Sequence, residues 1–198
     1  MGTRLETPAE KPATIDRGDR IEEQLSLKSR FVLIYGEITD TLAQATCRRL
    51  LALSEASDAP ITVLISSPGG HVESGDAIHD MIRFVRTPVT TVGTGWVASA
   101  GAHVFLAPPK DRRVCLPNTR FMIHQPAGGA GGQATDIAIQ AREILRTRER
   151  IARVVAKQTG KPFDTVVSDM ERDFWMNAEE AVKYGIASRI IETQKDLA

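Results

Sequence analysis

Apolar runs of five residues alternate along the chain with stretches in which apolar residues recur every three or four positions. FVLIY at 31–35 ends at a glycine and ITVLI at 61–65 ends at SSPGG, so both are short apolar segments closed by turn residues. Such segments are typical of strands buried in a sheet. The same reasoning predicts further strands at 88–92, 112–116, 120–124 and 189–191.

Two helices are predicted with recognisable N-terminal signals. Asp40 is a candidate N-cap for a helix over 41–56. Asn177 is a candidate N-cap for a helix over 178–184, because Glu180 occupies the third helical position and completes a capping box. The apolar face of the first of these helices is predicted to be Ala43, Cys47, Leu50 and Leu51.

Two more helices are predicted at 72–85 and 135–159. The second is the longest periodic stretch, and it stops at Gly160 with Pro162 beyond, a typical C-terminal signal. Their apolar faces are Ile78, Met81, Ile82 and Val85, and Ile137, Ala141, Ile144, Leu145, Ile151 and Val155. Strands that alternate with helices predict an α/β fold with buried sheets.

Composition narrows the class of protein. A length of 198 residues fits one α/β domain. Lys+Arg and Asp+Glu both number 25, and this balance argues against a nucleic-acid or anionic-lipid partner. No apolar run approaches the roughly 20 residues of a membrane span. The two cysteines lie in dissimilar contexts and are expected to be reduced thiols, so we expect a cytoplasmic protein without a membrane partner.

The first 20 residues differ from the rest. They are polar, include Pro8 and Pro12, and lack the apolar core of a secretory signal. We predict a flexible or processed arm over 1–20 and a single domain over 21–198.

The segment from Gly93 to Ala107, GTGWVASAGAHVFLA, joins a predicted glycine-rich turn to an apolar helix start. Glycines permit a tight bend and the close approach of another backbone. A serine at a helix start lies beside unpaired amide hydrogens. Ser99 is therefore a candidate nucleophile, which would need a base, an orienting acid and an oxyanion site.

Four histidines are candidates for the base. His71 and His79 lie around the predicted helix over 72–85 and are expected at the surface or supporting that turn. His103 follows Ser99 by one helical turn and would approach the hydroxyl group from below. His124 ends a strand and precedes a Pro- and Gly-rich loop, so its position favours it as the base.

The acid and the oxyanion donors are less constrained by position. The acid candidates in the DMERD cluster are Asp169, Glu171 and Asp173. Their positions do not show which of the three would be the acid, and the cluster is also typical of a solvated acidic turn. One oxyanion donor is the amide of Ala100, directly after the serine, and the other is an amide of the SSPGG turn, at Gly69 or Gly70.

Five motifs together resemble one family. They are SPGG, G-x-x-AS-x-GA, CLPN-[ST]-R-x-MIHQP, GQATDI-x-I-x-AREIL and ERD-x-x-(M/L)-x-A-x-EAV-x-YG. In this order, over about residues 31–191, they resemble the proteolytic subunit of the Clp protease (ClpP). The resemblance implies a catalytic triad of Ser99, His124 and Asp173, with Gly70 and Ala100 donating the oxyanion-hole amides.

The resemblance also implies a fold and an assembly. The fold is the ββα superhelix of the ClpP/crotonase type, with a protruding handle over about 125–160 made of the GGAGG strand and the long helix. Two stacked seven-membered rings, a tetradecamer, enclose a chamber. The residues implied in contacts between the rings are Gln133, Asp136, Glu171 and Arg172.

The implied activity is ATP-dependent proteolysis for protein quality control. The chain would be a serine endopeptidase acting on unfolded polypeptides and peptides, with a Clp ATPase or a ClpP paralogue as partner. No cofactor or metal is implied, because ATP would be used by the partner.

The sequence departs from the family pattern in the regions that serve docking and gating. IEEQLSL replaces an aromatic-containing stretch in the N-terminal segment. Thr62 and Leu64 stand where many members carry tyrosines of the ATPase-docking pockets, whereas Phe84 matches such a position. Ser66 replaces the usual asparagine before SPGG. These departures leave the triad intact.

Three alternatives follow from the same residues. A non-catalytic ring subunit of a mixed Clp complex is disfavoured because all three triad residues are present. A crotonase acting on acyl-CoA thioesters is disfavoured because no basic set for coenzyme A is evident. A membrane-bound relative of the signal-peptide-peptidase type is disfavoured because no spanning segment is present.

Overall fold

A seven-stranded mixed sheet forms the centre of the described chain. The structure is a computed structural model, which describes residues 28–129 and 131–197. The sheet has the order β1-β2-β3-β4-β7, while β5 pairs with β3 and β6 pairs with β5. Only the β5–β6 pair is antiparallel among these described strands. The strands are β1 (Phe31–Tyr35), β2 (Ile61–Ser67), β3 (Val89–Ala98), β4 (Arg113–Cys115), β5 (Arg120–Ile123), β6 (Phe174–Met176) and β7 (Arg189–Ile190).

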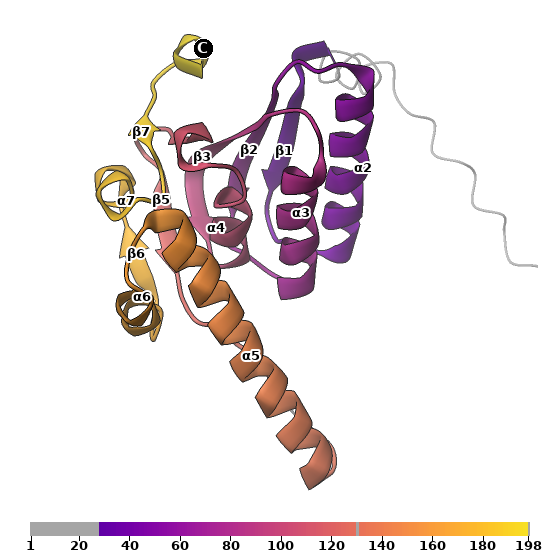
Figure 1. Cartoon of the computed structure of the whole chain (residues 1–198), viewed down its shortest axis with the longest axis vertical. Helices are drawn as coiled ribbons and strands as arrows, with labels where there is room; N and C mark the ends of the chain where they lie inside the picture. The colour runs from indigo at the N-terminus through magenta and orange to yellow at the C-terminus, as the bar shows by residue number, and fades with distance from the viewer. Residues whose placement is uncertain (1–27, 130, 198) are drawn as a thin grey trace, which may run out of the picture.

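Helices cover the sheet, and one of them, α5, projects away from it. Figure 1 shows α2 and α3 running side by side, α4 beside β3, and α5 projecting far from the rest of the chain. The helices are α2 (Asp40–Ala56), α3 (Val72–Phe84), α4 (Ala100–Phe105), α5 (Ala134–Thr159), α6 (Phe163–Asp169) and α7 (Ala178–Tyr184), with short 3-10 turns η1 (Lys110–Arg112) and η2 (Gln194–Leu197). Parallel strands joined through helices give the predicted α/β class.

The core contains buried side chains of the sheet, of α2, α3 and α4, and of parts of α5, α6 and α7. Alternate residues of β2 are fully buried, as expected for a strand whose two faces differ in covering. Phe105 of α4 meets Phe121 of β5 edge to face, with ring centroids 5.0 Å apart. This contact joins the helix after Ser99 to the strand before His124, so it fixes the two segments that carry the candidate site.

Strand β3 is longer than predicted. The segment Gly93–Ala98, expected to be a turn, continues the strand, because Trp96, Val97 and Ala98 pair with Arg120, Phe121 and Met122 of β5. A Cβ atom at Gly93 would lie 3.0 Å from the Phe121 ring. This glycine therefore permits close packing within the sheet instead of a bend.

The start of α2 also differs from the prediction. Thr39, not Asp40, is the N-cap, and its hydroxyl oxygen accepts a hydrogen bond from the Leu42 amide. Asp40 is the first helical residue and accepts from the Ser74 hydroxyl group instead. Leu51 was predicted on the buried face but is 39% exposed, because Leu53 takes the buried position.

The remaining predicted helices are found, and two short elements were not predicted. The capping box of Asn177 and Glu180 on α7 is present in both directions. Elements α6 and β6 were missed because they are only seven and three residues long, too short for a periodic signal.

The segment before α5 and the first half of α5 have few neighbours. The predicted GGAGG strand is not found, since no described residue of 125–133 pairs in a strand. Ile137 and Leu145 of the predicted stripe are exposed, whereas Val155 near the other end is buried. The predicted N-terminal arm over 1–20 lies outside the described residues.

Candidate active site

Ser99 sits at the junction of β3 and α4 in a strained backbone conformation. Its φ is +55° and its ψ is −122°, a combination that costs a non-glycine residue about 1–3 kcal/mol. Its backbone is held on both sides, since its amide donates to the Met122 carbonyl and its own carbonyl accepts from the His103 amide. As the N-cap of α4, Ser99 could use its hydroxyl group to cap the helix, but it makes no such bond. The hydroxyl group is therefore available for another partner.

Strand register places a histidine and a carboxylate next to this serine. In the parallel pair of β3 and β5, Ala98 faces Met122, so the chain leaves both strands at one edge of the sheet, Ser99 on one side and His124 on the other. In the antiparallel pair of β5 and β6, Ile123 faces Phe174, so the next position outward brings His124 opposite Asp173. Three residues far apart in sequence thus meet at one sheet edge.

Their side chains form a continuous chain of polar contacts. His124 Nε2 lies 2.8 Å from Ser99 Oγ, and His124 Nδ1 lies 3.1 Å from Asp173 Oδ1. With Nδ1 protonated and donating to the carboxylate, Nε2 is left as an acceptor for the serine hydroxyl group. The imidazole is 24% exposed, so a proton on it is partly solvated. The geometry is that of a nucleophile, a base and an orienting acid.

Glycines in the SSPGG turn let this turn approach Ser99. A Cβ atom at Gly69 would lie 2.6 Å from Ser99 Cβ, and one at Gly70 would lie 2.3 Å from the Ile38 carbonyl oxygen. Both glycines have positive φ, +100° and +148°, which favours glycine over any other residue.

The two predicted oxyanion donors lie at the ends of chain segments where amides lack partners. The Gly70 amide donates to no acceptor among the described residues. The Ala100 amide is in the first turn of α4, where the helix itself provides no acceptor. Both flank Ser99, one in the adjoining turn and one as its neighbour in sequence.

A small cavity opens beside the serine. It has a volume of about 30 Å³ and is lined by Val72, Ser99, Ala100, His103, His124, Pro126 and Ile151. Val72 and Pro126 also line an adjoining groove of about 400 Å³, which includes Gly70 and continues along the first half of α5. Pro126 and Ile151 were not singled out from the sequence as site residues. Their only signals were the Pro-rich loop after His124 and the apolar stripe of α5.

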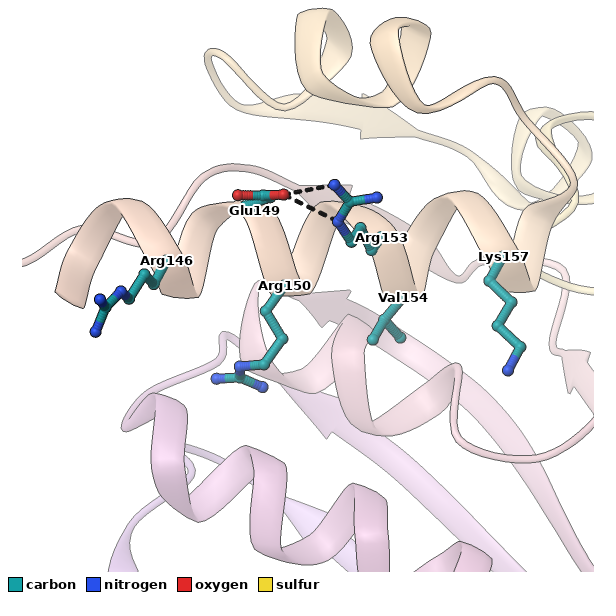
Figure 2. A pocket seen from close by; sticks show the side chains of 6 residues that line it. All are labelled: Arg146, Glu149, Arg150, Arg153, Val154 and Lys157. Atoms are coloured by element: carbon teal, nitrogen blue, oxygen red, sulfur yellow. Dashed lines mark hydrogen bonds and ion pairs between the residues drawn. The ribbon is translucent and has the colours of Figure 1, made fainter. Parts of the chain in front are cut away.

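A larger hollow of about 430 Å³ lies on α5 away from the serine. Figure 2 shows the side chains that line it, Arg146, Glu149, Arg150, Arg153, Val154 and Lys157, four of them cationic. The cationic side chains and the single carboxylate of this hollow include no hydroxyl or thiol nucleophile. The volume of a cavity therefore does not identify the candidate active site in this molecule.

The other histidines are placed away from the serine hydroxyl group. His71 contacts Asp40, Glu73 and Ser74 and is half exposed. His79 was expected at the surface or supporting the nearby turn, but it is buried. His103 turns its Nε2 toward Asp76.

The four residues predicted between rings fall into two groups within one chain. Gln133 and Asp136 are at the far end of α5 and exposed. Glu171 and Arg172 lie just before Asp173, and Glu171 pairs with Arg148 of α5. Twelve helical residues, about 18 Å at the helical rise, separate Asp136 from Arg148. A contact between the two groups would therefore need a second copy, and it stays a prediction.

The described residues contain no set of three or more His, Cys, Asp or Glu side chains arranged as metal ligands. Within 28–129 and 131–197, no helix has the length and apolar character needed to cross a bilayer.

The mixed sheet, the strand-end serine and its polar contacts define an α/β protein with the geometry of a serine hydrolase. Residues 16–194 match the family described as Clp protease, and the chain belongs to that family. It is 53% identical over 188 residues to the ATP-dependent Clp protease proteolytic subunit 3 of Rhizobium johnstonii, covering 95% of this chain and 96% of the relative.

Two further relatives agree. The chain is 46% identical to proteolytic subunit 2 of Pseudomonas aeruginosa, covering 88% of this chain and 87% of that one. It superposes on ClpP1 from Listeria monocytogenes with a TM-score of 0.82 and 48% identity, covering 90% and 99%. The predicted family and fold class are confirmed, as is the prediction of a Clp-type serine peptidase.

Proposed function

We propose that Ser99, His124 and Asp173 hydrolyse peptide bonds through an acyl-enzyme. The observation that supports this most is the unbroken chain of contacts from Asp173 through His124 to the Ser99 hydroxyl group. Ser99 Oγ attacks the peptide carbonyl carbon while His124 Nε2 takes the hydroxyl proton. The same proton then passes to the leaving amine as the C–N bond breaks. Water, deprotonated by His124, attacks the ester and releases the new carboxyl end and Ser99.

The tetrahedral intermediates carry a negative oxygen that the amides of Gly70 and Ala100 bind. An amide donor in such a site lowers the barrier by about 2.7–4 kcal/mol, by analogy with side-chain donors. Asp173 accepts a hydrogen bond from His124 Nδ1 and so holds the histidine in the tautomer that presents a lone pair to Ser99.

A fluorophosphonate probe followed by intact-mass measurement tests this chemistry. The wild-type chain should gain the mass of one phosphonyl group on Ser99, and peptide hydrolysis should stop with labelling. The Ser99→Ala variant is the matched control and should gain no mass. Labelling of another residue, or no labelling of a folded wild-type sample, would overturn the proposal.

The assembly we propose is a pair of stacked rings of this chain. The exposed apolar side chains Ile137, Ile139 and Leu145 on the projecting half of α5 support it, since an unpartnered apolar face favours burial in an interface. The names of the relatives support coupling to an ATPase that unfolds protein substrates. In this scheme ATP serves that partner, and the cytoplasm is the location.

Native mass spectrometry of the full chain, with and without a co-expressed Clp ATPase, tests the assembly. The predicted ring stoichiometry gives the mass of fourteen chains in the sample without the ATPase. The sample with the ATPase should show the same assembly with the mass of the bound ATPase in addition. A monomer at micromolar concentration that still hydrolyses peptides would contradict the closed chamber. A tetradecamer that binds no ATPase would contradict the coupling alone.

A further inference from the structure

The Gly69–Gly70 peptide is held from one side by the segment that follows β1. Ile38 of this segment donates its amide hydrogen to the Gly69 carbonyl over 2.8 Å, and its own carbonyl accepts from the His71 amide over 2.9 Å. In a planar trans peptide the N–H bond points opposite to the C=O bond, so the Gly70 amide hydrogen points away from Ile38. The direction of this proposed oxyanion donor is therefore set by the position of Ile38.

The space around this turn is as restricted as its hydrogen bonding. A Cβ atom at Gly70 would lie 2.8 Å from the Ile38 amide nitrogen. On its other side the turn contacts the nucleophile, since a Cβ atom at Gly69 would lie 3.0 Å from Ser99 Oγ. A shift of Ile38 would therefore move the Gly70 amide relative to Ser99.

Two residues after Ile38, Asp40 joins the same segment to the start of α3. Its carboxylate accepts a hydrogen bond from the Ser74 hydroxyl group and lies 3.0 Å from His71 Nδ1. His71 Nδ1 also lies 2.8 Å from Ser74 Oγ. Because the hydroxyl hydrogen is directed at Asp40, the Ser74 oxygen accepts from His71. We call Asp40, His71 and Ser74 the Asp40 cluster.

The Asp40 cluster has one buried member and two that reach solvent. Ser74 is 3% exposed and fixes the cluster to the core, whereas Asp40 is exposed and His71 is half exposed. The bond from Ser74, followed by the contacts with His71, holds the pKa of Asp40 below its ordinary value, so the carboxylate acts only as an acceptor. Exposed contacts of this kind change the stability of the whole chain little, so we expect their effect on local geometry.

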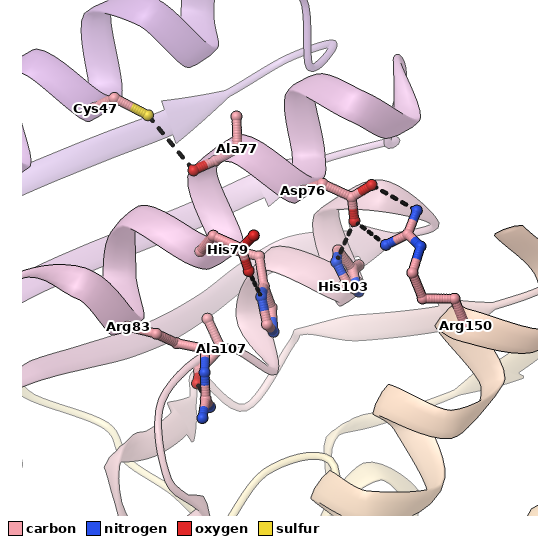
Figure 3. A network of polar contacts seen from close by, with 9 residues as sticks. Cys47, Asp76, Ala77, His79, Arg83, His103, Ala107 and Arg150 are labelled. Atoms are coloured by element: carbon pink, nitrogen blue, oxygen red, sulfur yellow. Dashed lines mark hydrogen bonds and ion pairs between the residues drawn. The ribbon is translucent and has the colours of Figure 1, made fainter.

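Other contacts fix the rest of α3 to its neighbours. Figure 3 shows Asp76 between Arg150 of α5 and His103 of α4. It also shows Cys47 of α2 next to the Ala77 carbonyl, which accepts from its thiol. These contacts lie beyond the first turn of α3. Removal of the Asp40 cluster should therefore loosen only the turn before α3 and leave the helix in place.

We infer that Asp40 is a positioning residue that holds Ile38 against the SSPGG turn and so aims the Gly70 amide at the negative oxygen of the tetrahedral intermediates. This inference rests on the proposed function, because Gly70 is an oxyanion donor only if Ser99 attacks a carbonyl group. Without the carboxylate, the turn is held by its backbone bonds alone and samples positions in which the Gly70 amide lies away from the developing charge. Such a change destabilises the transition state more than the bound substrate.

The first test separates substrate binding from transition-state stabilisation in the full-length oligomer. Asp40→Ala and Ser74→Ala should each lower kcat for peptide hydrolysis about tenfold, which is part of the roughly 10²–10³-fold contribution of a whole donor, while KM changes less than about twofold. A peptide boronic acid, which forms a tetrahedral adduct with Ser99, should bind about tenfold more weakly to both variants. The double variant should lose no more than the larger single loss, because both changes break one contact.

Two further variants are controls. Asp40→Asn should keep kcat within about twofold of the wild type, because its amide oxygen still accepts from Ser74. Asp58→Ala is the matched control, since Asp58 is also exposed but lies beyond the other end of α2, where it contacts Arg86 at 3.4 Å. It should keep the wild-type kcat and inhibitor affinity. Unchanged values in Asp40→Ala and Ser74→Ala, or an equal loss in Asp58→Ala, would overturn the inference, while peptide cleavage itself upholds the proposed function.

Hydrogen exchange provides a readout that does not depend on activity. The His71 amide, bonded to the Ile38 carbonyl, should exchange several-fold faster in Asp40→Ala than in the wild type, and Asp58→Ala should match the wild type. Equal exchange in all three would overturn the positioning role even if no peptide is cleaved. The absence of cleavage in a folded wild-type oligomer would count against the proposed function alone.

Discussion

His124 and His103 both line the cavity beside Ser99, but they reach it from different surroundings. His124 follows a strand, is 24% exposed and has a polar partner at each ring nitrogen. His103 is inside a short helix, 5% exposed, and lies in a stack with His79. Each is near an aspartate, yet only His124 has a serine hydroxyl group at its other nitrogen.

This difference supports the proposal that His124, and not His103, is the base. A base needs a partner that fixes its tautomer, a reactive hydrogen on the other side and enough access to water to carry a charge briefly. His124 has all three. His103 has a carboxylate neighbour and a stacked imidazole but no serine hydroxyl group, so it lacks the geometry of a base.

The largest effect on activity is expected when the proposed base, His124, is removed. The His124→Ala variant should lose about 10⁶-fold in kcat, as should Ser99→Ala, because members of such a triad act as a unit. Steady-state peptide hydrolysis measures the loss. The His103→Ala variant should lose far less, because His103 Nε2 lies against Asp76 and not against the serine hydroxyl group. Equal losses at both histidines would contradict the division of roles.

Asp173→Asn should have the next largest effect. An asparagine keeps the shape but favours the wrong imidazole tautomer, so kcat should fall about 10⁴-fold. The variant should retain the wild-type unfolding midpoint, because Asp173 is exposed. The control is Asp169→Asn, from the same acidic cluster, whose partner is the Tyr184 hydroxyl group. A comparable loss in the control would assign the role to the cluster and not to Asp173.

The sequence could predict the proposed triad only in part, for reasons that these residues illustrate. Ser99 and His124 have local signals, a glycine-rich approach and a strand end. Asp173 has none, because its position depends on the antiparallel pairing of β5 with a three-residue strand that has no detectable period. The motif resemblance, not periodicity, distinguished Asp173 from Asp169 and Glu171.

The fold was more predictable than the contacts between its elements. Strand and helix order followed from apolar patterning, because each pattern is local. The strand character of Gly93–Ala98 was missed because glycine in a sequence does not distinguish a bend from close packing against Phe121. The contacts of Asp76 with His103 and Arg150 were also not predicted, since these partners are 27 and 74 residues further along the chain.

A smaller effect is expected where the SSPGG turn meets the nucleophile. In Gly69→Ala, the new methyl group would overlap Ser99 Cβ, and the positive φ would be strained. A displacement of Ser99 by about 1 Å should reduce kcat about 10²-fold while KM changes little. Gly131→Ala is the control, because a Cβ atom there meets nothing within 4 Å. A Gly69→Ala enzyme with full activity would show that this turn does not position the serine.

The smallest predicted effect concerns the buried partner of His103. Burial, followed by the proximity of His103, lowers the pKa of His79 from 6.5 to about 4. As the pH falls below 6.5, the unfolded chain binds a proton at His79 before the folded chain does, so stability decreases between about pH 6.5 and pH 4. The loss between pH 7 and pH 5 should be about 2 kcal/mol per chain.

The His79→Gln variant should lack this part of the pH dependence. Thermal unfolding at pH 7 and pH 5, at one protein concentration, measures the midpoint shift for both proteins. The shift in the wild type should be larger by several degrees, whatever the absolute stability of the variant at pH 7. His71→Gln is the control, because it also replaces an imidazole by an amide, but at a half-exposed position. Equal shifts in wild type and His79→Gln would mean that the buried imidazole takes up its proton as readily as a solvated one, and would contradict this prediction.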